Sequence, residues 1–462
     1  MTAASVAANL GGVAFFALPG LGLSELFASL RRLSLPRRLG YAWLLGVVGI
    51  GGILFLLSHL FAVPLRRPVL LAVAFVPVAL GLTAWLRRRR GQARAAAEPA
   101  RRRNPWQTLA LLALFAAGLG PLASALAAPL ADWDGRMTWG PLASYVRHEG
   151  SVDASVLRDS RWWVIHPRYP PLLPLAQAAI QETLGAGEDE QDFRAFYVTF
   201  LFALLLVVHD GARRAAGPVM AVLTPLAVAL PPFWSYGGGG ATSAYSDLPL
   251  AGFYGAGCVL LFAAQPSVSA GFAAGCLLAG AVLTKNEGAL LAVAVLLLAA
   301  FRLLWSRSPR PTGWFAAAAS PVLLALGLLA SWRSAIPNRA DEDYWGALHL
   351  TELLRGAVSR LPLIVPEILR WTFRWSDWLG FWILFLAVVI LGWRALRRPL
   401  ARRMLLAGLV PPAVAYAAYA VSSRAADLIG ETWERFLLQG LVPLTVLFAA
   451  ALGHALRRRG YS

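Results

Sequence analysis

Two aspartates, Asp132 and Asp134, stand two positions apart at the start of the longest polar interruption of the chain, over residues 131–175. Such a carboxylate can take a proton from a hydroxyl nucleophile, and a pair of them can ligate a divalent cation through hard oxygen atoms. The structural alternative is that Asp134 caps a helix beginning at Gly135 while Asp132 is merely solvated. The neighbouring tryptophans, arginines and His-Pro-Arg-Tyr-Pro-Pro run favour chemistry, because polar loops of membrane proteins can line a site away from lipid.

Lys285 is the only lysine among 42 basic residues, and it lies two residues from Glu287 in LTKNEGALL. Arginine and lysine differ in size, hydration and hydrogen-bond geometry, so this exception indicates a pocket that fits a compact ammonium group. The alternative is a lysine at the membrane boundary that extends toward the headgroups beside Glu287. The sequence leaves both open.

Five further residues are candidates for substrate binding. Asp247 heads an apolar run in AYSDLPL, where it either caps a helix or faces a cavity. Arg435, in WERFLLQGLVP, stands at the start of the last apolar run, where it either anchors that run or binds an anion. Individually His166, Arg168 and Tyr169 suit loop packing, but together they offer cationic and aromatic contacts to a phosphate or a sugar ring.

The composition places these residues in a polytopic all-α membrane protein. The mean hydropathy is +0.60, and only 14% of the residues are charged. The net charge is +18, and most arginines fall in short clusters between apolar runs. This pattern indicates that the arginines set the topology in the membrane and contact anionic lipid headgroups, rather than that they bind nucleic acid. Cys258 and Cys276 lie within apolar runs without metal-ligand spacing, and we expect them in the core.

About thirteen apolar runs are long enough to cross about 30 Å of hydrocarbon. They fall near residues 4–29, 39–63, 68–86, 107–130, 193–209, 218–233, 247–264, 271–285, 287–304, 312–332, 377–393, 404–421 and 436–455. With this number of spans, all the basic segments fall on one side of the membrane: 31–38, 87–103, 213–214, 302–310, 394–403 and 457–459. The positive-inside rule predicts that this side faces the cytoplasm and that the protein spans the plasma membrane. The extracytoplasmic segments are then 131–192, 234–246, 333–376 and 422–435, and the exception is the short outer link 64–68, which carries two arginines.

The chain divides into an N-terminal three-helix membrane unit at 1–86, a basic cytoplasmic linker at 87–105 and a transmembrane catalytic domain at 106–462. In the first outer segment, apolar spacing predicts an amphipathic helix ending near Gly150. Prolines then forbid a helix until about Leu172, after which an interfacial or re-entrant helix follows. The Gly237–Gly240 run permits close backbone approach to a ligand or a mobile link, and 333–376 is suited to lying among headgroups.

Over residues 105–455 the chain resembles the GT-C type of bacterial membrane glycosyltransferases, the superfamily of protein O-mannosyltransferases and of the aminoarabinose transferase acting on lipid A. The resemblance rests on the order and common side of five motifs: DWDGRMTWGPLA, YPPLLPL, YSDLPL, TKNEG and WERFLLQGLVP. The chain lacks the Asp-Glu pair of the mannosyltransferases and adds three N-terminal spans, which leaves the acceptor and the choice between the two aspartates open.

The resemblance implies an inverting transfer from a polyprenyl-phosphate sugar to an extracytoplasmic acceptor. Asp134 looks like the principal acid, with Asp132 as its neighbour. Lys285 and Arg435 look like contacts to the lipid phosphate, with Arg168 a weaker third. A divalent cation such as Mg²⁺ or Mn²⁺ at the two aspartates is left open, because two carboxylates make an incomplete site.

Two other classes of function are compatible with the same residues. A transporter or lipid flippase predicts polar residues deep in several spans and often a repeat of broken helices. A non-catalytic membrane scaffold predicts that each candidate residue has its separate structural explanation. A scaffold need not bring Asp134, Asp247, Lys285 and Arg435 around one cavity, whereas the transferase expectation places that cavity between the 131–192 and 333–376 segments.

Overall fold

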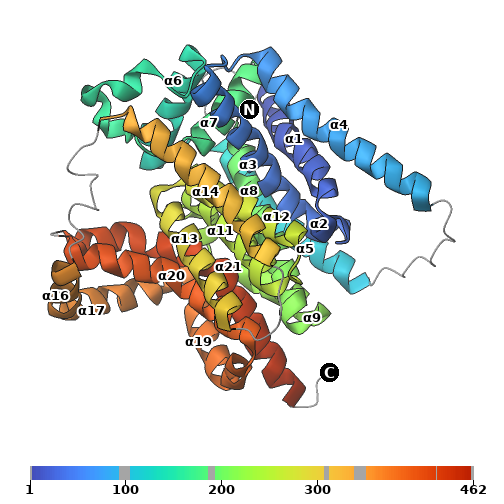
Figure 1. The fold of residues 1–462 in the computed structure, drawn as a ribbon. Helices are drawn as coiled ribbons and strands as arrows, with labels where there is room; N and C mark the ends of the chain where they lie inside the picture. The colour runs from blue at the N-terminus through green and yellow to red at the C-terminus, as the bar shows by residue number, and fades with distance from the viewer. Residues whose placement is uncertain are drawn as a thin grey trace.

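The protein is helical throughout the part of the chain that the computed structural model describes, and no strand occurs there. The described residues are 3–92, 105–185, 193–305, 312–337, 350–422 and 424–458. Among them, eight helices are long and apolar enough to cross a membrane, and five further apolar helices are shorter. Together these thirteen coincide in position with the thirteen expected apolar runs (Figure 1).

The N-terminal helices are α1 (Ala3–Leu26), α2 (Ala28–Arg31), α3 (Leu35–Phe61) and α4 (Arg67–Gln92). The next part contains α5 (Pro105–Ala127), the π-helical turn η1 (Gly135–Trp139), α6 (Gly140–Glu149), the 3₁₀ turns η2 (Ser155–Arg158) and η3 (Ser160–Ile165), and α7 (Leu172–Leu184). The central helices are α8 (Arg194–Ala216), α9 (Pro218–Ala229), α10 (Phe233–Tyr236), α11 (Asp247–Cys258) with its π-turn η5 (Val259–Ala263), α12 (Val268–Thr284), α13 (Asn286–Trp305) and α14 (Thr312–Ser334). The C-terminal part comprises α16 (Leu350–Ser359), α17 (Leu361–Thr372), α18 (Trp375–Trp378), α19 (Phe381–Leu391), η6 (Trp393–Arg397), α20 (Pro399–Val421) and α21 (Ala425–Arg458).

Helix α21 is the buried centre of the bundle and packs against α8, α11, α17, α19 and α20. It begins at Ala425, so the last helix starts before the apolar run expected at 436–455, and most of the expected outer segment 422–435 forms the first turns of this 34-residue helix. Hydropathy misses these turns because they contain charged residues. Glu434 and Arg435 are nevertheless accommodated, because each forms an ion pair with a residue from another segment, Arg374 and Asp134 respectively.

Helices α1 and α3 share the hydrophobic core of the following helices. The rings of Phe16 and Trp43 lie 5.3 and 5.5 Å from that of Phe196 in α8, measured between centroids. The three-helix unit expected at 1–86 therefore packs directly on α8. The division into domains stays a prediction.

A buried carboxylate also joins α3 to α8. Asp210 is fully buried, accepts hydrogen bonds from Tyr41 Oη at 2.8 Å and from Arg214 Nε at 2.7 Å, and forms an ion pair with Arg37. A buried charge needs such partners to offset the loss of hydration. The cluster fixes α3 on α8 at the end of α8 that carries the arginines expected in the cytoplasm.

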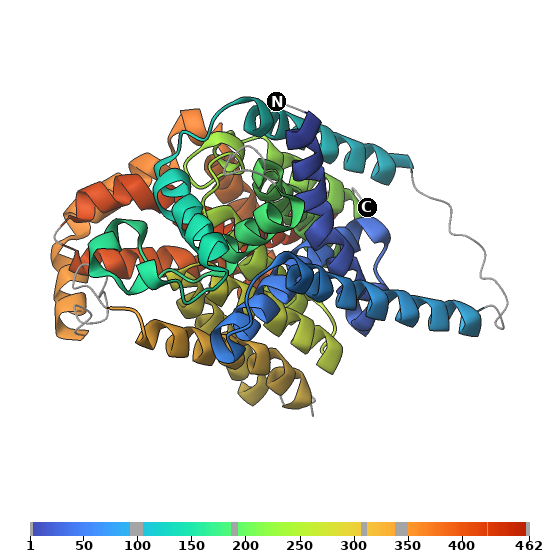
Figure 2. The same ribbon diagram turned by 90° about the horizontal axis from the view of Figure 1, so that it is seen from above.

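The segment from η1 to α7 lies across the opposite end of the bundle, as Figure 2 shows from above. Helix α6 ends at Gly150, as the sequence predicts. Gly150 adopts a left-handed conformation with φ of +65°. Arg66 is one of the two arginines in the link 64–68 that is expected outside, and its Nη1 and Nη2 donate to the carbonyls of Arg147 and His148 at 3.5 Å. These carbonyls lie at the C-terminal end of α6, where the helix dipole favours a cation.

Helix α7 begins at Leu172, as the prolines predict, and its 13 residues are too few to span. Nearly all of them are buried, and α7 packs against α3 and α6. It is therefore inserted into the protein rather than laid on its surface, which fits the re-entrant alternative.

Helices α16 and α17 lie at the periphery beside α20 and α21 in both views (Figures 1 and 2). They expose Leu354, Val358, Leu363 and Leu369. This is the amphipathic pattern that the sequence predicts within the segment 333–376. The part of the third outer segment over 338–349 lies outside the described residues.

Candidate functional site

The centre of the candidate site is an ion pair between Asp247 and Lys285. Asp247 is the first residue of α11, and Lys285 stands in an extended conformation at the break between α12 and α13. Lys285 Nζ donates to Asp247 Oδ1 at 2.8 Å, and Gln439 Nε2 of α21 donates to the same oxygen at 3.0 Å. Since Asp247 is 1% exposed and Lys285 8%, the lysine points into the bundle and not toward the headgroups.

Glu287 provides a second carboxylate for Lys285, with 3.3 Å between Nζ and Oε1. The two carboxylates stabilise the ammonium form of Lys285 and offset the cost of burying its charge. The ammonium therefore stays charged. The lysine thus lies beside Glu287, as expected, but it is buried and does not extend toward the headgroups; its role in substrate binding stays a prediction.

Asp134 forms the second ion pair of the site, with Arg435. Arg435 Nη1 donates to Asp134 Oδ2 at 2.9 Å, although the two residues are 301 positions apart in the chain. Asp134 does stand at the N-cap position of η1, which begins at Gly135 as the structural alternative expects, but its carboxylate makes no capping hydrogen bond and faces Arg435 instead. The backbone N–H of Asp134 donates to Tyr245 Oη at 3.1 Å, and the Arg435 guanidinium lies 4.6 Å from the centroid of the Tyr245 ring.

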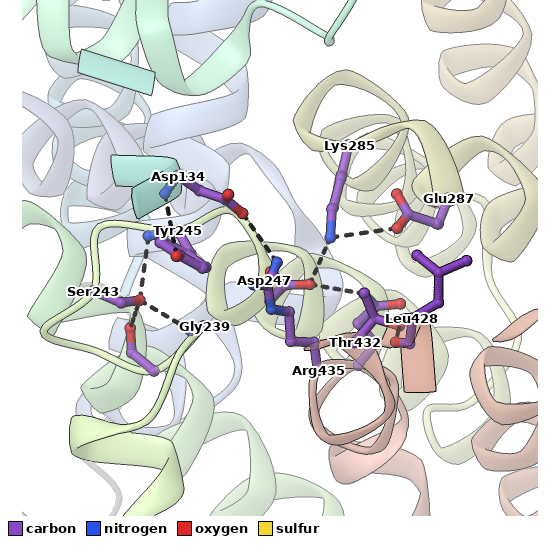
Figure 3. A network of polar contacts seen from close by, with 12 residues as sticks. Asp134, Gly239, Ser243, Tyr245, Asp247, Lys285, Glu287, Leu428, Thr432 and Arg435 are labelled. Carbon is purple, nitrogen blue, oxygen red and sulfur yellow. Dashed lines mark hydrogen bonds and ion pairs between the residues drawn. The ribbon is translucent and has the colours of Figure 1, made fainter. Parts of the chain in front are cut away.

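The Gly237–Gly240 loop brings these two ion pairs together (Figure 3). Gly239 has φ of +98°, and a Cβ atom there would lie 3.3 Å from Asp247 Cβ and 3.4 Å from Arg435 Cγ. Ser243 Oγ accepts a hydrogen bond from Gly239 N at 3.2 Å and donates to the Gly240 carbonyl at 2.8 Å. Gly239 and Gly240 are thus buried, and the loop backbone approaches the side chains of the site closely.

Asp132 lies beside this cluster and is half-buried. Burial raises its pKa, and the charges of Arg194 and Arg435 oppose that shift. Arg194, at the start of α8, donates to the carbonyls of Ala128 and Thr242 at 2.8 and 2.7 Å. It therefore fixes the segment before Asp132 against the loop that carries Tyr245.

The His-Pro-Arg-Tyr-Pro-Pro run forms an aromatic stack at the edge of the site. The ring of Tyr169 lies between those of His166 and Trp139, with centroid distances of 4.8 and 5.5 Å. The carbonyl of Arg168 accepts a hydrogen bond from Arg333 Nε at 2.9 Å. Through Arg333, which also contacts Asn286, this run lies near Lys285.

Four residues of the site were missed from the sequence: Arg194, Tyr245, Arg333 and Gln439. Arg333 also donates to Asn286, the residue between Lys285 and Glu287. Arg194 and Arg333 both stand at ends of apolar runs that the arginine pattern assigns to the outside, and this departure from the positive-inside rule was a usable signal. Gln439 is a polar residue inside an apolar run, one helical turn after Arg435.

The carboxylates of Asp132 and Asp134 do not form a suitable binding site for a metal ion. One of the two carboxylates already faces the Arg435 guanidinium. Within the ranges that the structure describes, no group of three or more His, Cys, Asp or Glu side chains is placed to hold a metal ion. Two carboxylates, one of them neutralised, do not make a complete ligand set for Mg²⁺ or Mn²⁺.

Two buried oxygen atoms of the site have no hydrogen-bond donor among the described residues: Asp247 Oδ2 and Gln439 Oε1. Buried acceptors are normally satisfied, so these positions suit an ordered water molecule or a ligand hydroxyl. The arrangement as a whole combines a carboxylate that is partly accessible, Asp134, with two cations and two acceptors.

Comparison of the chain with protein-family models, with curated proteins and with solved structures finds no match. Over the described residues the protein is all-helical, with eight candidate membrane spans.

Proposed function

We propose that the protein is a GT-C-like integral membrane glycosyltransferase that moves a sugar from a polyprenyl-phosphate donor to an acceptor on the extracytoplasmic side. The observation that supports this is the convergence of Asp134, Asp247, Lys285 and Arg435 on one cluster. They come from four different parts of the chain: Asp134 precedes η1, Asp247 begins α11, Lys285 precedes α13, and Arg435 lies within α21. A scaffold gives no reason for them to meet.

The chemistry needs a base and a cationic place for the leaving group. In the proposed step, Asp134 accepts the proton of the acceptor hydroxyl. The oxygen of that hydroxyl attacks the anomeric carbon from the face opposite the phosphate. The bond from that carbon to the phosphate oxygen breaks, and both electrons leave with the lipid phosphate. Lys285 and Arg435 stabilise the negative charge that develops there, and the configuration at the anomeric carbon is inverted.

The surroundings of the cluster suit a sugar ring carried by a lipid. Asp247 Oδ2 and Gln439 Oε1 are acceptors for sugar hydroxyl groups. The stack of His166 and Tyr169 supplies an aromatic surface, and Arg333 links its segment to Asn286, the neighbour of Lys285. A polyprenyl donor reaches such a cluster from the bilayer, in keeping with the five motifs that resemble GT-C enzymes.

The rival function is transport, and one observation favours it. The Asp247–Lys285 pair is buried inside the helical bundle, where ionisable residues often mark the path of an ion or a solute. The exposure of Asp134, whose side chain is 33% accessible, favours transfer chemistry at the end of the bundle.

One experiment separates the two functions. The purified protein is reconstituted in vesicles with a panel of radiolabelled polyprenyl-phosphate sugars, and both the release of sugar from the lipid and the movement of label across the bilayer are followed. The proposal expects one donor to be consumed, including slow transfer to water without an acceptor. Movement of an intact labelled lipid across the bilayer, with no donor consumed, would establish the transport function instead.

A further inference from the structure

Each cation at the centre of the site is already paired with a carboxylate. Lys285 faces Asp247 and Glu287, and Arg435 faces Asp134. Three carboxylates against two cations leave one net negative charge. A phosphate group therefore gains little from this cluster as it stands, because each cation that attracts it comes with a carboxylate that repels it. A phosphate donor binds well only if one carboxylate gives up its cation.

The two main ion pairs differ in how easily they open. The side chains of Lys285 and Asp247 are 10% and 1% exposed, and Gln439 adds a hydrogen bond to the carboxylate. Breaking this pair would leave a buried charge without a partner, which is costly. The side chains of Arg435 and Asp134 are 19% and 33% exposed, and water can replace the lost contact. The Arg435–Asp134 pair is therefore the one that opens.

The position of Tyr245 allows Arg435 to exchange partners without disturbing Asp134. The guanidinium rests on the Tyr245 ring, and this contact does not depend on the Asp134 carboxylate. The backbone of Asp134 is held independently, by Tyr245 Oη. Of the guanidinium nitrogens of Arg435, only Nη1 donates a hydrogen bond to another described residue. The other N–H groups of the guanidinium can therefore engage a phosphate first.

We propose that Arg435 is a latch on the catalytic base: in the empty site it neutralises Asp134, and in the loaded site the donor phosphate draws it away and leaves Asp134 as a free carboxylate. This inference rests on the proposed transferase function and adds regulation to it. The base is unmasked only when a donor is present, so proton abstraction is tied to a loaded site. The acceptor proton then passes to Asp134, and Arg435 stays with the departing phosphate.

Binding of the bare lipid phosphate tests the latch directly. Calorimetric titration in detergent micelles compares a polyprenyl phosphate without sugar with the uncharged polyprenol of the same length. In the Asp134→Asn variant Arg435 has no carboxylate to give up, so we expect the phosphate to bind about three- to ten-fold more tightly than in the wild type. Polyprenol affinity should not change. The matched control is Asp427→Asn, which removes an exposed aspartate from the same helix as Arg435.

Unchanged or weaker phosphate binding by Asp134→Asn, with phosphate still preferred over polyprenol by the wild type, overturns the latch and leaves the proposed function intact. A wild type that does not distinguish polyprenyl phosphate from polyprenol overturns both. A second readout avoids the variant altogether. Polyprenyl phosphate should increase modification of Asp134 by a water-soluble carbodiimide, mapped by mass spectrometry, and polyprenol should not. Equal modification with both lipids contradicts the latch.

Discussion

Lys285 Nζ and Asp247 Oδ1 lie 2.8 Å apart in the interior of the bundle, although the two residues are 38 positions apart in the chain. The pair joins the start of α11 to the break between α12 and α13. It also accounts for the single lysine of the chain: the ammonium fits between two carboxylates at 2.8 and 3.3 Å, where the larger planar guanidinium would have to displace its neighbours.

Removing the lysine should be strongly destabilising. We expect Lys285→Met to lower the free energy of unfolding by about 3–5 kcal/mol, because it leaves Asp247 buried without a cation. The double variant Lys285→Met with Asp247→Asn should regain most of this loss, because no buried charge remains. Unfolding in detergent micelles measures both effects. The matched control is Arg424→Met, whose partner Asp427 is exposed and which should change stability by less than about 0.5 kcal/mol. A loss of similar size in the single and double variants contradicts the explanation.

Two glycines of the Gly237–Gly240 loop, Gly238 and Gly240, should respond differently to substitution by alanine. At Gly240 a Cβ atom would lie 2.5 Å from the Phe233 carbonyl oxygen, whereas at Gly238 nothing lies within 4 Å. We expect Gly240→Ala to cost about 1–3 kcal/mol, and to lower activity by displacing Tyr245, while Gly238→Ala is tolerated. Melting temperatures and transfer rates of the two variants provide the comparison. Equal behaviour of the two would mean that the loop is not packed as described.

The half-buried Asp132 should make stability depend on pH. Its pKa in the folded protein lies above the ordinary value of 3.8, mainly because of burial. The folded state therefore favours the protonated form, and the wild type loses stability as the pH rises from 3.8 through the folded pKa. Asp132→Asn removes this penalty, so the variant should be more stable than the wild type at neutral pH and equal to it in acid. Melting curves at several pH values measure the difference. A variant less stable than the wild type at neutral pH would show that the Asp132 carboxylate is stabilising.

The orientation in the membrane can be tested with a pair of serine replacements. Ser155 and Ser34 are both exposed, the first in the expected outer segment 131–192 and the second in the expected cytoplasmic segment 31–38. In a background with Cys258 and Cys276 replaced by alanine, a membrane-impermeant maleimide added to intact cells should label Ser155→Cys. Ser34→Cys should react only after permeabilisation. The reverse pattern would place the candidate site on the cytoplasmic side.

Local signals in the sequence account for what was predicted correctly about the fold. Apolar runs located the helices, the proline cluster fixed the start of α7 at Leu172, and Gly150 fixed the end of α6. These signals act within a few residues of the chain. For the same reason they failed at α21, where Glu434 and Arg435 are stabilised in the helix by partners from distant segments.

The candidate site was predictable as a set of residues but not as an arrangement. Asp134, Asp247, Lys285 and Arg435 stood out by type and position. Their pairing depends on how four segments pack, which no local pattern encodes. The same limit explains why Gln439 was missed: it matters only because α21 places it beside Asp247.

The central claim is that Asp134 serves as the base of a sugar transfer, and the initial rate of sugar release from the consumed donor tests it most directly. The rate is compared among the wild type, Asp134→Asn, the double variant Asp132→Asn with Asp134→Asn, and the control Asp427→Asn, all checked for folding by gel filtration. Loss of a general base typically costs a factor of about 10²–10⁴. We therefore expect a fall of at least about 100-fold in both Asp134 variants and none in the control. A double variant that transfers sugar at the wild-type rate would contradict the claim.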